Sequence, residues 1–433
     1  MMLALVFSLF PRVSAQKDRI FRFGPTDNEA RVTMVSEPVR YNADRGYGFD
    51  FENPGPVRIH DPGRNGRGYC TSDRPFYFSI RVPEGSYEVR VLLGNPRKKS
   101  VTTIKAEARR LMLFDQPLEK GGSQVVHFIV NVRNPVIEGT DSIRLKSREY
   151  NYMNWDDRLT LEFSGNHQAV QEIIIRPATW ITTLYLAGNS TVTDQDVEPW
   201  ASWGQMITRY LDTTVAVANF AESGESLASF KGSGRLRKVL SLIRPGDYLF
   251  IEFGHNDQKR KGEGIGPWTT FTELLEEFVH STREKGAIPV LITPTQRRSF
   301  NDSGKISPTH GDYPAAMRKV AEEMDVPLID LNAVTKTLYE AWGPEVSRKA
   351  FVQYPAGTFP GQEEELKDNT HFNAFGANEI ALCVLQGIIN LNLPLKAHLI
   401  HFSGTYDPAR PSDPKEWTLQ ESPRYISTKP EGN

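Results

Sequence analysis

The chain has little of what would place it in several large protein classes. Its 433 residues include only two cysteines, Cys70 and Cys383, which lie in different halves. Two such thiols build neither a disulfide framework nor a CxxC metal site, so we expect both to be small buried side chains. An excess of one charge is also missing, because 51 basic residues face 53 acidic ones and leave a net charge of -2. Without a basic excess, no nucleic-acid partner is expected.

Long apolar runs are absent beyond the N-terminus. No later segment reaches the roughly 18 uninterrupted apolar residues that cross a bilayer, so no membrane span is predicted. At the N-terminus, an apolar run from Leu3 to Phe10 precedes the small-residue pattern Val13-Ser14-Ala15. This order is typical of a signal peptide cleaved after Ala15, although a charged segment before the run is missing. We therefore predict a signal peptide over residues 1–15 and a secreted or periplasmic location.

The first half of the chain has the rhythm of short strands. From about residue 20 to 178, apolar and polar residues alternate in short segments that Gly, Pro and Asn turns separate. Many short strands without a helical period between them predict an antiparallel β-sandwich or jelly roll over residues 20–178. The expected strands are Phe76–Val82, Ser86–Gly94, Ser123–Val132, Asp141–Ser147, Arg158–Gly165 and Val170–Pro177.

After Thr179 the rhythm changes to nearly continuous apolar strands that alternate with helical stretches. This alternation predicts an α/β domain over residues 180–392, with a parallel sheet buried on both faces. The expected strands are 183–188, 213–220, 247–254, 288–294 and 326–331, and the expected helices are Phe271–Lys285, Tyr313–Met324 and Ala374–Asn390. Residues 393–433 are rich in Pro, Ser and charge, so we expect an irregular extension that wraps the surface or is partly disordered.

The segments that follow these strands carry the polar residues of an acyl-transfer site. The first strand ends in Gly188-Asn189 and presents Ser190; a strand-to-helix turn alone would also use Gly and Asn in this way. The second strand leads to Gly224, the third to Asn256, and "DNTHFN" places Asp368 and His371 just before the last helix. Ligands bind at the carboxyl ends of strands in open α/β sheets, so these residues are expected to converge.

Each residue type has a chemical reason to be there. The Ser190 hydroxyl needs a general base, which His371 can provide, and Asp368 can fix the tautomer of that imidazole. A tetrahedral intermediate needs donors placed in advance, and the candidates are the N–H groups of Ser190 and Gly224 and the Asn256 carboxamide. The pattern predicts a serine hydrolase that needs no cofactor.

The four segments resemble those of the SGNH (GDSL-type) hydrolases, whose name records Ser, Gly, Asn and His in this order. The resemblance covers about residues 182–391 and implies a flavodoxin-like catalytic domain with Ser190, Gly224, Asn256, His371 and Asp368 in the family's roles. The segments "STVTDQ", "PWASWGQM", "NFAESGES", "FGHNDQK", "THGDYP" and "YPAGTFPGQ" look like the rhamnogalacturonan acetylesterase branch. The first half, with "YGFDF" and "NWDDRLTLEF", resembles the galactose-binding-like sandwich of two-domain bacterial members.

One position departs from the family pattern. The first segment of the family usually reads Gly-Asp-Ser, whereas this chain has Gly188-Asn189-Ser190. Asn keeps the shape of Asp and accepts hydrogen bonds, but it lacks the charge. We expect reduced or retuned activity rather than an inactive enzyme.

Further residues are candidates for substrate binding. Aromatic faces stack on sugars, which makes Trp200 and Trp203 candidates, although a helix starting there would bury at least one of them. Other candidates are Lys259, Arg297 and Arg298, which could pair with galacturonate carboxylates, and His310 at the rim. No zinc site is expected, because His398 and His401 lack a third ligand and no HExxH motif occurs.

The resemblance implies removal of acetyl groups from pectic rhamnogalacturonan, with an acetylated pectic polysaccharide or oligosaccharide as the partner. Two alternatives stay open. One is an esterase for another acylated polysaccharide, a lipid or a small ester, and the polar stretch "GHNDQKRKGEGIG" argues against long acyl chains. The other is a non-catalytic carbohydrate-binding protein, which the sandwich and Asn189 would allow.

Overall fold

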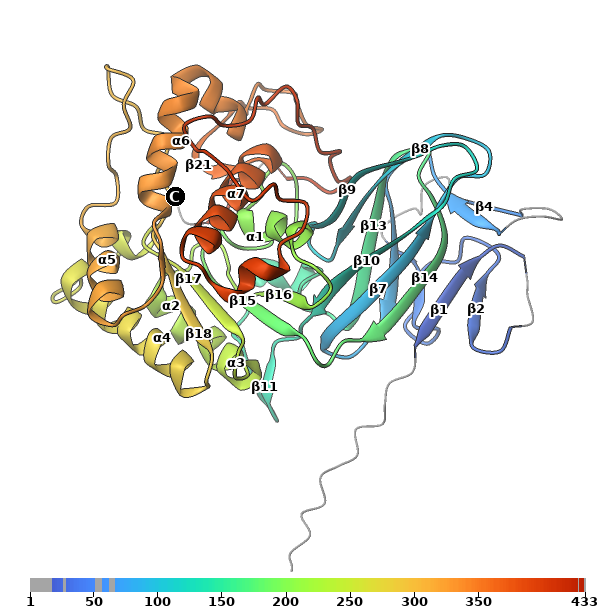
Figure 1. Cartoon of the computed structure of the whole chain (residues 1–433), viewed down its shortest axis with the longest axis horizontal. Coiled ribbons are helices and arrows are strands. Elements are labelled where there is room, and N and C mark those ends of the chain that lie inside the picture. Colours follow the sequence, from blue (N-terminus) through green and yellow to red (C-terminus); the bar gives the residue numbers. More distant parts are fainter. Residues whose placement is uncertain (1–17, 26–28, 51–56, 62–66, 427, 432–433) are drawn as a thin grey trace, which may run out of the picture.

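The computed structural model describes residues 18–25, 29–50, 57–61, 67–426 and 428–431 (Figure 1). The predicted signal peptide, residues 1–15, lies outside the described residues. In the described part of the chain, no helix combines the length and the apolar character that a bilayer crossing requires. Figure 1 shows the strand-rich first half beside an α/β second half.

The first half forms two facing sheets. The larger has the path β10-β7-β14-β1-β2, with β5 added beside β14 and β4 beside β5; the other has the order β3-β6-β13-β8-β9. The strands of the larger sheet are β1 Arg19–Phe23, β2 Val32–Val35, β4 Arg58–His60, β5 Tyr69–Thr71, β7 Gly85–Leu93, β10 Gln124–Val132 and β14 Ala169–Pro177. Those of the other are β3 Tyr47–Asp50, β6 Phe76–Arg81, β8 Ser100–Ala106, β9 Arg110–Leu118 and β13 Arg158–Asn166. Their inner faces share an apolar core that includes Phe21, Phe23, Phe49, Phe76 and Phe78.

Two details of the first half differ from the sequence prediction. The pairing is antiparallel throughout these two sheets except between β1 and β2, which run parallel. The expected strand Asp141–Ser147 is wrong beyond Ser142, because only β12 (Asp141–Ser142) pairs, with β11 (Val136–Glu138). A 3-10 helix, Ser147–Asn151, follows instead. There the buried carboxylate of Glu149 accepts hydrogen bonds from Arg235 and Trp155, which directs the chain toward the second half.

The second half contains a parallel sheet of order β16-β15-β17-β18-β19, the flavodoxin-like arrangement. Its strands are β15 Thr182–Gly188, β16 Val215–Asn219, β17 Tyr248–Glu252, β18 Ile288–Ile292 and β19 Leu328–Ile329. Alternate residues of β15 enter opposite cores: Leu184 and Leu186 join one, Tyr185 and Ala187 the other. Such two-sided burial explains why the strands read as continuous apolar runs.

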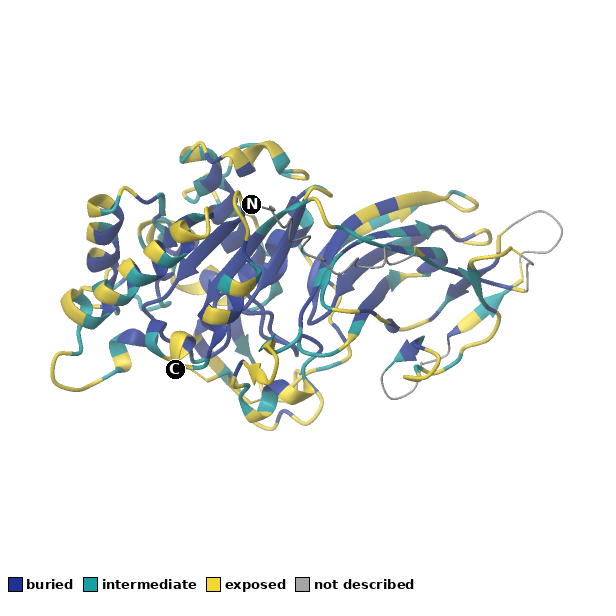
Figure 2. Cartoon of the chain, turned by 90° about the horizontal axis from the view of Figure 1, so that it is seen from below, coloured by how far each residue is buried: buried dark blue, intermediate teal, exposed yellow. Residues whose placement is uncertain are grey.

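Helices cover both faces of this sheet, and Figure 2 shows the buried strands between partly exposed helices. One core contains residues of α1 (Trp203–Met206), α6 (Leu331–Val346) and α7 (Ala374–Asn390). The opposite core contains residues of α2 (Leu227–Gly232), α3 (Arg235–Leu242), α4 (Thr272–Glu284) and α5 (Tyr313–Glu323). The sequence did not reveal the antiparallel pair β20 (Phe351–Tyr354) and β21 (Leu366–Phe372).

The two halves meet through buried charges, and the first half supplies them from the turn between β8 and β9 (Arg109), the start of β9 (Arg110) and the residue after β10 (Arg133). Asp194, four positions after Ser190, pairs with Arg110 Nε (3.5 Å) and Arg133 Nη2 (3.1 Å), and it accepts from Asn219 Nδ2 (2.8 Å). Arg109 donates to the carbonyl oxygens of Gln195 and Trp200 and pairs with Glu198. We call Arg109, Arg110, Arg133, Asp194 and Glu198 the junction cluster; all five are nearly inaccessible to solvent.

The C-terminal extension binds both halves. After the 3-10 helix Pro394–His398 it is irregular, and Trp417 stacks on Phe114 of β9 with ring centres 5.3 Å apart. Ser422 Oγ donates to Glu162 Oε2 (2.7 Å) of β13. The described residues of the extension, up to 431, therefore pack against the surface of the first half.

Candidate active site

The nucleophile turn follows β15, and its first glycine is required by crowding. A Cβ atom at Gly188 would lie 2.6 Å from Val192 Cγ2, so only glycine fits where the chain folds back. The N–H groups of Val192 and Thr193 both donate to the Asn189 carbonyl (3.0 and 2.9 Å), which closes the turn. Ser190 is thereby presented at the tip of the strand, at the carboxyl edge of the sheet.

Ser190, His371 and Asp368 form one hydrogen-bonded chain. His371 Nε2 lies 2.7 Å from Ser190 Oγ, and His371 Nδ1 lies 2.7 Å from Asp368 Oδ2. Because a carboxylate accepts the Nδ1 proton, Nε2 is left to accept the serine proton. All three side chains are buried.

The carboxylate of this chain is held by its own backbone. Asp368 Oδ1 accepts from the N–H groups of Thr370 (2.8 Å) and His371 (2.9 Å), so β21 fixes the acid and the imidazole together. Burial alone would raise the pKa of Asp368, but the hydrogen bond and charge of His371 and these N–H groups lower it to about 2. The group is an anion at neutral pH, as the partner of a developing imidazolium must be.

The three predicted oxyanion donors belong to one neighbourhood. Gln195 Nε2 donates to the Ser190 carbonyl (2.8 Å) and lies 3.4 Å from Ser223 Oγ, which links the nucleophile turn to the residue before Gly224. Asn256 Nδ2 donates to the carbonyl of Glu225 (3.0 Å), the residue after Gly224. Gly224 has φ +83°, a left-handed conformation that favours glycine.

The orientation of the Asn256 carboxamide is fixed from both ends. Lys259 Nζ donates to Asn256 Oδ1 (3.3 Å), while Nδ2 uses one of its two hydrogens on Glu225. The second Nδ2 hydrogen remains for another acceptor. Among the described residues, the N–H groups of Ser190 and Gly224 have no hydrogen-bond acceptor, so three donors are left for an oxyanion.

A second carboxyl group lies behind the nucleophile turn, and sequence reasoning missed it. Glu252, the last residue of β17, is fully buried and accepts from Thr191 Oγ1 (2.7 Å) and Trp203 Nε1 (2.6 Å). Burial raises its pKa to about 7, against the opposing effect of these two donors and of a backbone hydrogen bond from Thr295. Asn189 Oδ1 accepts from the Thr191 N–H (3.1 Å) and hydroxyl (3.0 Å), so Thr191 connects the two side chains. The only sequence signal was a Glu at the end of an apolar strand.

Three cations surround the site. Lys259 contacts Asn256, and the lowering of its pKa to about 8 results from burial and from the charges of Arg297 and Lys429. Lys429 Nζ lies 3.8 Å from Asp368 Oδ2. We call Lys259, Arg297 and Lys429 the cation cluster. The sequence singled out the first two, but nothing in the sequence places Lys429 of the extension here.

Several predicted substrate contacts are contradicted by burial. Trp200 and Trp203 are 1% and 0% exposed, because the segment packs under the nucleophile turn and Trp203 donates to Glu252. His310 is not at the rim: it is 2% exposed and its Nε2 lies 3.0 Å from His255 Nδ1. Burial and the charges of Arg297 and Lys259 lower the pKa of His310 to about 3. Two neutral imidazoles thus pack behind the site.

Arg298 also has a different role from the predicted one. Its guanidinium donates to Ser347 Oγ (3.0 Å) and Asn369 Oδ1 (3.1 Å) and binds the Pro344 carbonyl. These contacts hold the segment that carries Asp368 and His371. No described group of three His, Cys, Asp or Glu side chains is arranged to hold a metal ion.

Sequence comparisons with known proteins give a family match and several relatives. Residues 186–378 match the model of the GDSL-like lipase/acylhydrolase family. The chain is 47% identical over 223 residues to rhamnogalacturonan acetylesterase RhgT of Bacillus subtilis, an alignment that covers 51% of this chain and 95% of RhgT. It is 38% identical over 220 residues to the probable rhamnogalacturonan acetylesterase YesY of the same organism, covering 50% and 97%. The uncharacterized esterase YxiM, also from B. subtilis, aligns at 27% identity over 402 residues, covering 89% and 95%.

Proposed function

The chain belongs to the GDSL-like lipase/acylhydrolase family and is a serine carboxylic ester hydrolase, and from this premise we propose that it is a carbohydrate O-acetylesterase acting on pectic rhamnogalacturonan. The observation that carries the proposal is the chain of two 2.7 Å hydrogen bonds from Asp368 through His371 to Ser190. The names of RhgT and YesY support an acetylated rhamnogalacturonan as the substrate.

The proposed reaction has two steps. Ser190 Oγ attacks the acetyl carbonyl carbon while His371 Nε2 takes the hydroxyl proton, and Asp368 balances the charge of the imidazolium. The oxyanion accepts hydrogen bonds from the N–H groups of Ser190 and Gly224 and from Asn256 Nδ2. The imidazolium then protonates the sugar oxygen, which leaves as an alcohol. Water, deprotonated by His371, releases acetate from the acyl-serine.

The charge around the site supports an anionic sugar. Lys259, Arg297 and Lys429 lie near one another at the catalytic groups, and galacturonate supplies one carboxylate in each repeat of the proposed substrate. The cation cluster favours a ligand with negative charge over a neutral one. The polar setting also disfavours a long acyl chain.

The test is acetate release from acetylated rhamnogalacturonan by the wild-type chain and by Ser190→Ala. We expect release by the wild type and a loss of about four orders of magnitude or more in the variant, with an unchanged melting temperature. Acetylated xylan is the matched substrate without galacturonate backbone charge. Faster release from xylan would overturn the pectic assignment, and no release from any acetate ester, including p-nitrophenyl acetate, would overturn the esterase.

We also propose that the protein is exported, on the basis of the apolar run Leu3–Phe10 and the Val13-Ser14-Ala15 pattern. N-terminal sequencing of the protein made by its natural host is the test. A mature chain that starts at Gln16 supports the proposal, and an intact Met1 contradicts it.

A further inference from the structure

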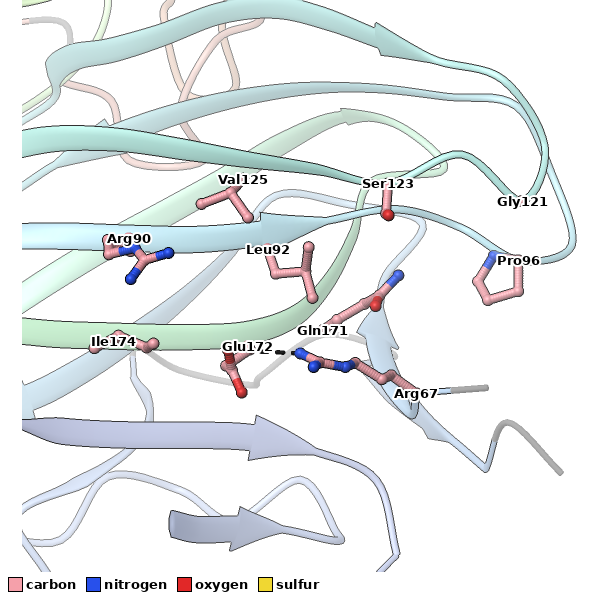
Figure 3. Close-up of a pocket in the computed structure, with 10 residues that line it drawn as sticks. All are labelled: Arg67, Arg90, Leu92, Pro96, Gly121, Ser123, Val125, Gln171, Glu172 and Ile174. Atoms are coloured by element: carbon pink, nitrogen blue, oxygen red, sulfur yellow. Dashed lines mark ion pairs between the residues drawn. The ribbon is translucent and has the colours of Figure 1, made fainter. Parts of the chain in front are cut away.

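A cavity of about 650 Å³ lies on the first half of the molecule, on the larger sheet (Figure 3). Its floor is formed by neighbouring strands in two cross-strand rows. Leu92 of β7 pairs in register with Val125 of β10 and with Glu172 of β14, and Arg90 pairs with Ile174. Residues of one row lie about 5 Å apart across the strands, so these side chains share one surface.

This surface is the outer face of the sandwich. Successive residues of a strand point to opposite faces. The residues between those of the cavity, Val89 and Val91 on β7 and Ile173 and Ile175 on β14, are buried in the core between the two sheets. The cavity residues therefore project away from that core, and Val125 is 41% exposed.

The chemistry of the face is unusual for a solvent-exposed sheet. Three aliphatic side chains, those of Leu92, Val125 and Ile174, line the cavity together with Arg90 (Figure 3). Arg90 Nε is buried without a hydrogen-bond partner, and no described carboxylate pairs with this guanidinium. An arginine that pairs with no carboxylate of the described residues and lies beside aliphatic side chains offers a charged and planar contact for an anion.

The second charged group of the cavity is already neutralised. Glu172 Oε1 lies 3.7 Å from Arg67, and Glu172 Oε2 accepts from Arg22 Nη2 (2.8 Å). Arg22 is shared with Glu29, so the three arginines Arg22, Arg67 and Arg90 face two carboxylates here. The charge that is left unbalanced is positive.

The cavity is separate from the catalytic site. β7 begins at Gly85, next to the junction between the halves, where the Ala178 N–H donates to the Ser86 carbonyl. Arg90 is five residues further along the strand, about 17 Å from Gly85 at the rise of a β-strand. A polymer that spans both places would contact the protein at two positions.

We propose that this cavity binds a uronate-bearing stretch of polysaccharide, with the Arg90 guanidinium paired to a sugar carboxylate and the aliphatic side chains against the ring faces. The inference rests on the proposed function, because an acetylated galacturonate polymer is the ligand that the catalytic site would share. Binding here would hold the polymer while its acetyl groups are removed at Ser190, which raises the local concentration of ester.

The binding test uses the full chain with Ser190→Ala, so that no turnover occurs, and titrates it calorimetrically with oligogalacturonate. Two classes of site are expected, one at the cation cluster and one at Arg90. Adding Arg90→Gln should weaken the second class by about tenfold or more and leave the first unchanged. Arg81→Gln, at an exposed arginine on the opposite sheet that pairs with Asp157, is the matched control.

Three outcomes would overturn the proposal: identical isotherms for the Arg90→Gln and control variants, equal binding of the carboxyl-reduced oligosaccharide, and a single class of site that Arg90→Gln leaves intact. Val125→Glu is a second variant at an exposed position, and its added negative charge should abolish binding in the cavity without a folding penalty.

The kinetic test separates this inference from the proposed function. With Ser190 intact, Arg90→Gln should raise KM for the acetylated polymer and leave hydrolysis of p-nitrophenyl acetate unchanged. An unchanged KM for the polymer would contradict the inference alone. If the wild type releases no acetate from the polymer, the proposed function fails. The calorimetric comparison of Arg90→Gln with the control still decides whether the cavity binds a uronate.

Discussion

Two buried carboxyl groups lie behind the same nucleophile segment, and they are satisfied in opposite ways. Asp194, on the side of the sandwich, is paired with Arg110 and Arg133. Glu252, inside the catalytic sheet, accepts from neutral donors, the side chains of Thr191 and Trp203 and the backbone of Thr295, and burial raises its pKa to about 7. The arginines of the sandwich thus anchor Asp194 by charge pairing. The catalytic half keeps in Glu252 a carboxyl group that changes its protonation near neutral pH.

The largest effect on stability is expected when the pairing of Asp194 with its arginines is removed. Asp194→Ala leaves the buried Arg133 without a described carboxylate partner and Arg110 with Glu107 alone, 3.8 Å away, so the free energy of unfolding should fall by about 3–5 kcal/mol. Chemical denaturation followed by fluorescence measures this. Asp157→Ala removes the partner of the exposed Arg81 and should cost less than about 1 kcal/mol. Equal effects of the two substitutions would show that the junction cluster is no anchor.

The next prediction concerns Glu252. Its folded pKa of about 7 is above the unfolded value of about 4.3, so the folded state holds its proton more tightly and the wild type loses stability as pH rises through this interval. Glu252→Gln keeps an acceptor for Trp203 and removes the titration. The variant should gain about 3 kcal/mol over the wild type between about pH 4 and pH 8. Parallel stability curves over this range would contradict the assignment.

A third substitution tests the oxyanion donors of the catalytic half and leaves the pairing of Asp194 with its arginines intact. Asn256→Ala removes one oxyanion donor, so kcat should fall about a hundredfold while KM for a small ester changes little. Lys261→Ala, in the exposed loop beyond it, is the control and should leave kcat unchanged. If Asn256→Ala also lowers the melting temperature, the loss of kcat would indicate a structural role of Asn256 instead.

The smallest expected effect is that of Asn189→Asp. The Asn189 Nδ2 is buried without a described partner, while its Oδ1 accepts from Thr191, so an aspartate loses no hydrogen bond here. The added charge would favour the imidazolium of His371, and turnover of p-nitrophenyl acetate should rise by less than about tenfold. If turnover does not change, the charge at this position has no part in the rate.

Local patterns predicted the elements that carry the site. Continuous apolar runs that end in polar residues identified β15 and β17, and the D-x-x-H pattern before the last helix identified Asp368 and His371, because strand burial and short motifs are local properties. The helix Ala374–Asn390 has the predicted bounds. The pair β20–β21 was missed because its residues, which include the catalytic candidates, do not form an apolar run.

Long-range contacts account for the other errors. Trp200 and Trp203 follow the nucleophile closely in sequence, yet burial at 1% and 0% exposure depends on Glu252 and on Arg109, which come from distant segments. Lys429 reaches Asp368 only because the extension folds back over the second half. The pairing of Asp194 with Arg110 and Arg133 joins residues more than sixty positions apart, and no spacing rule indicates it.

The junction cluster has a consequence for protein engineering. A chimera that joins this catalytic half to a foreign sandwich would lack Arg110 and Arg133. The buried carboxylate of Asp194 would then have no cation partner, next to the segment that presents the nucleophile. Neither half can therefore be exchanged for that of another protein without changing the residues at the junction. A workable graft must transplant the three residues as a set or replace the aspartate by a neutral side chain in the recipient.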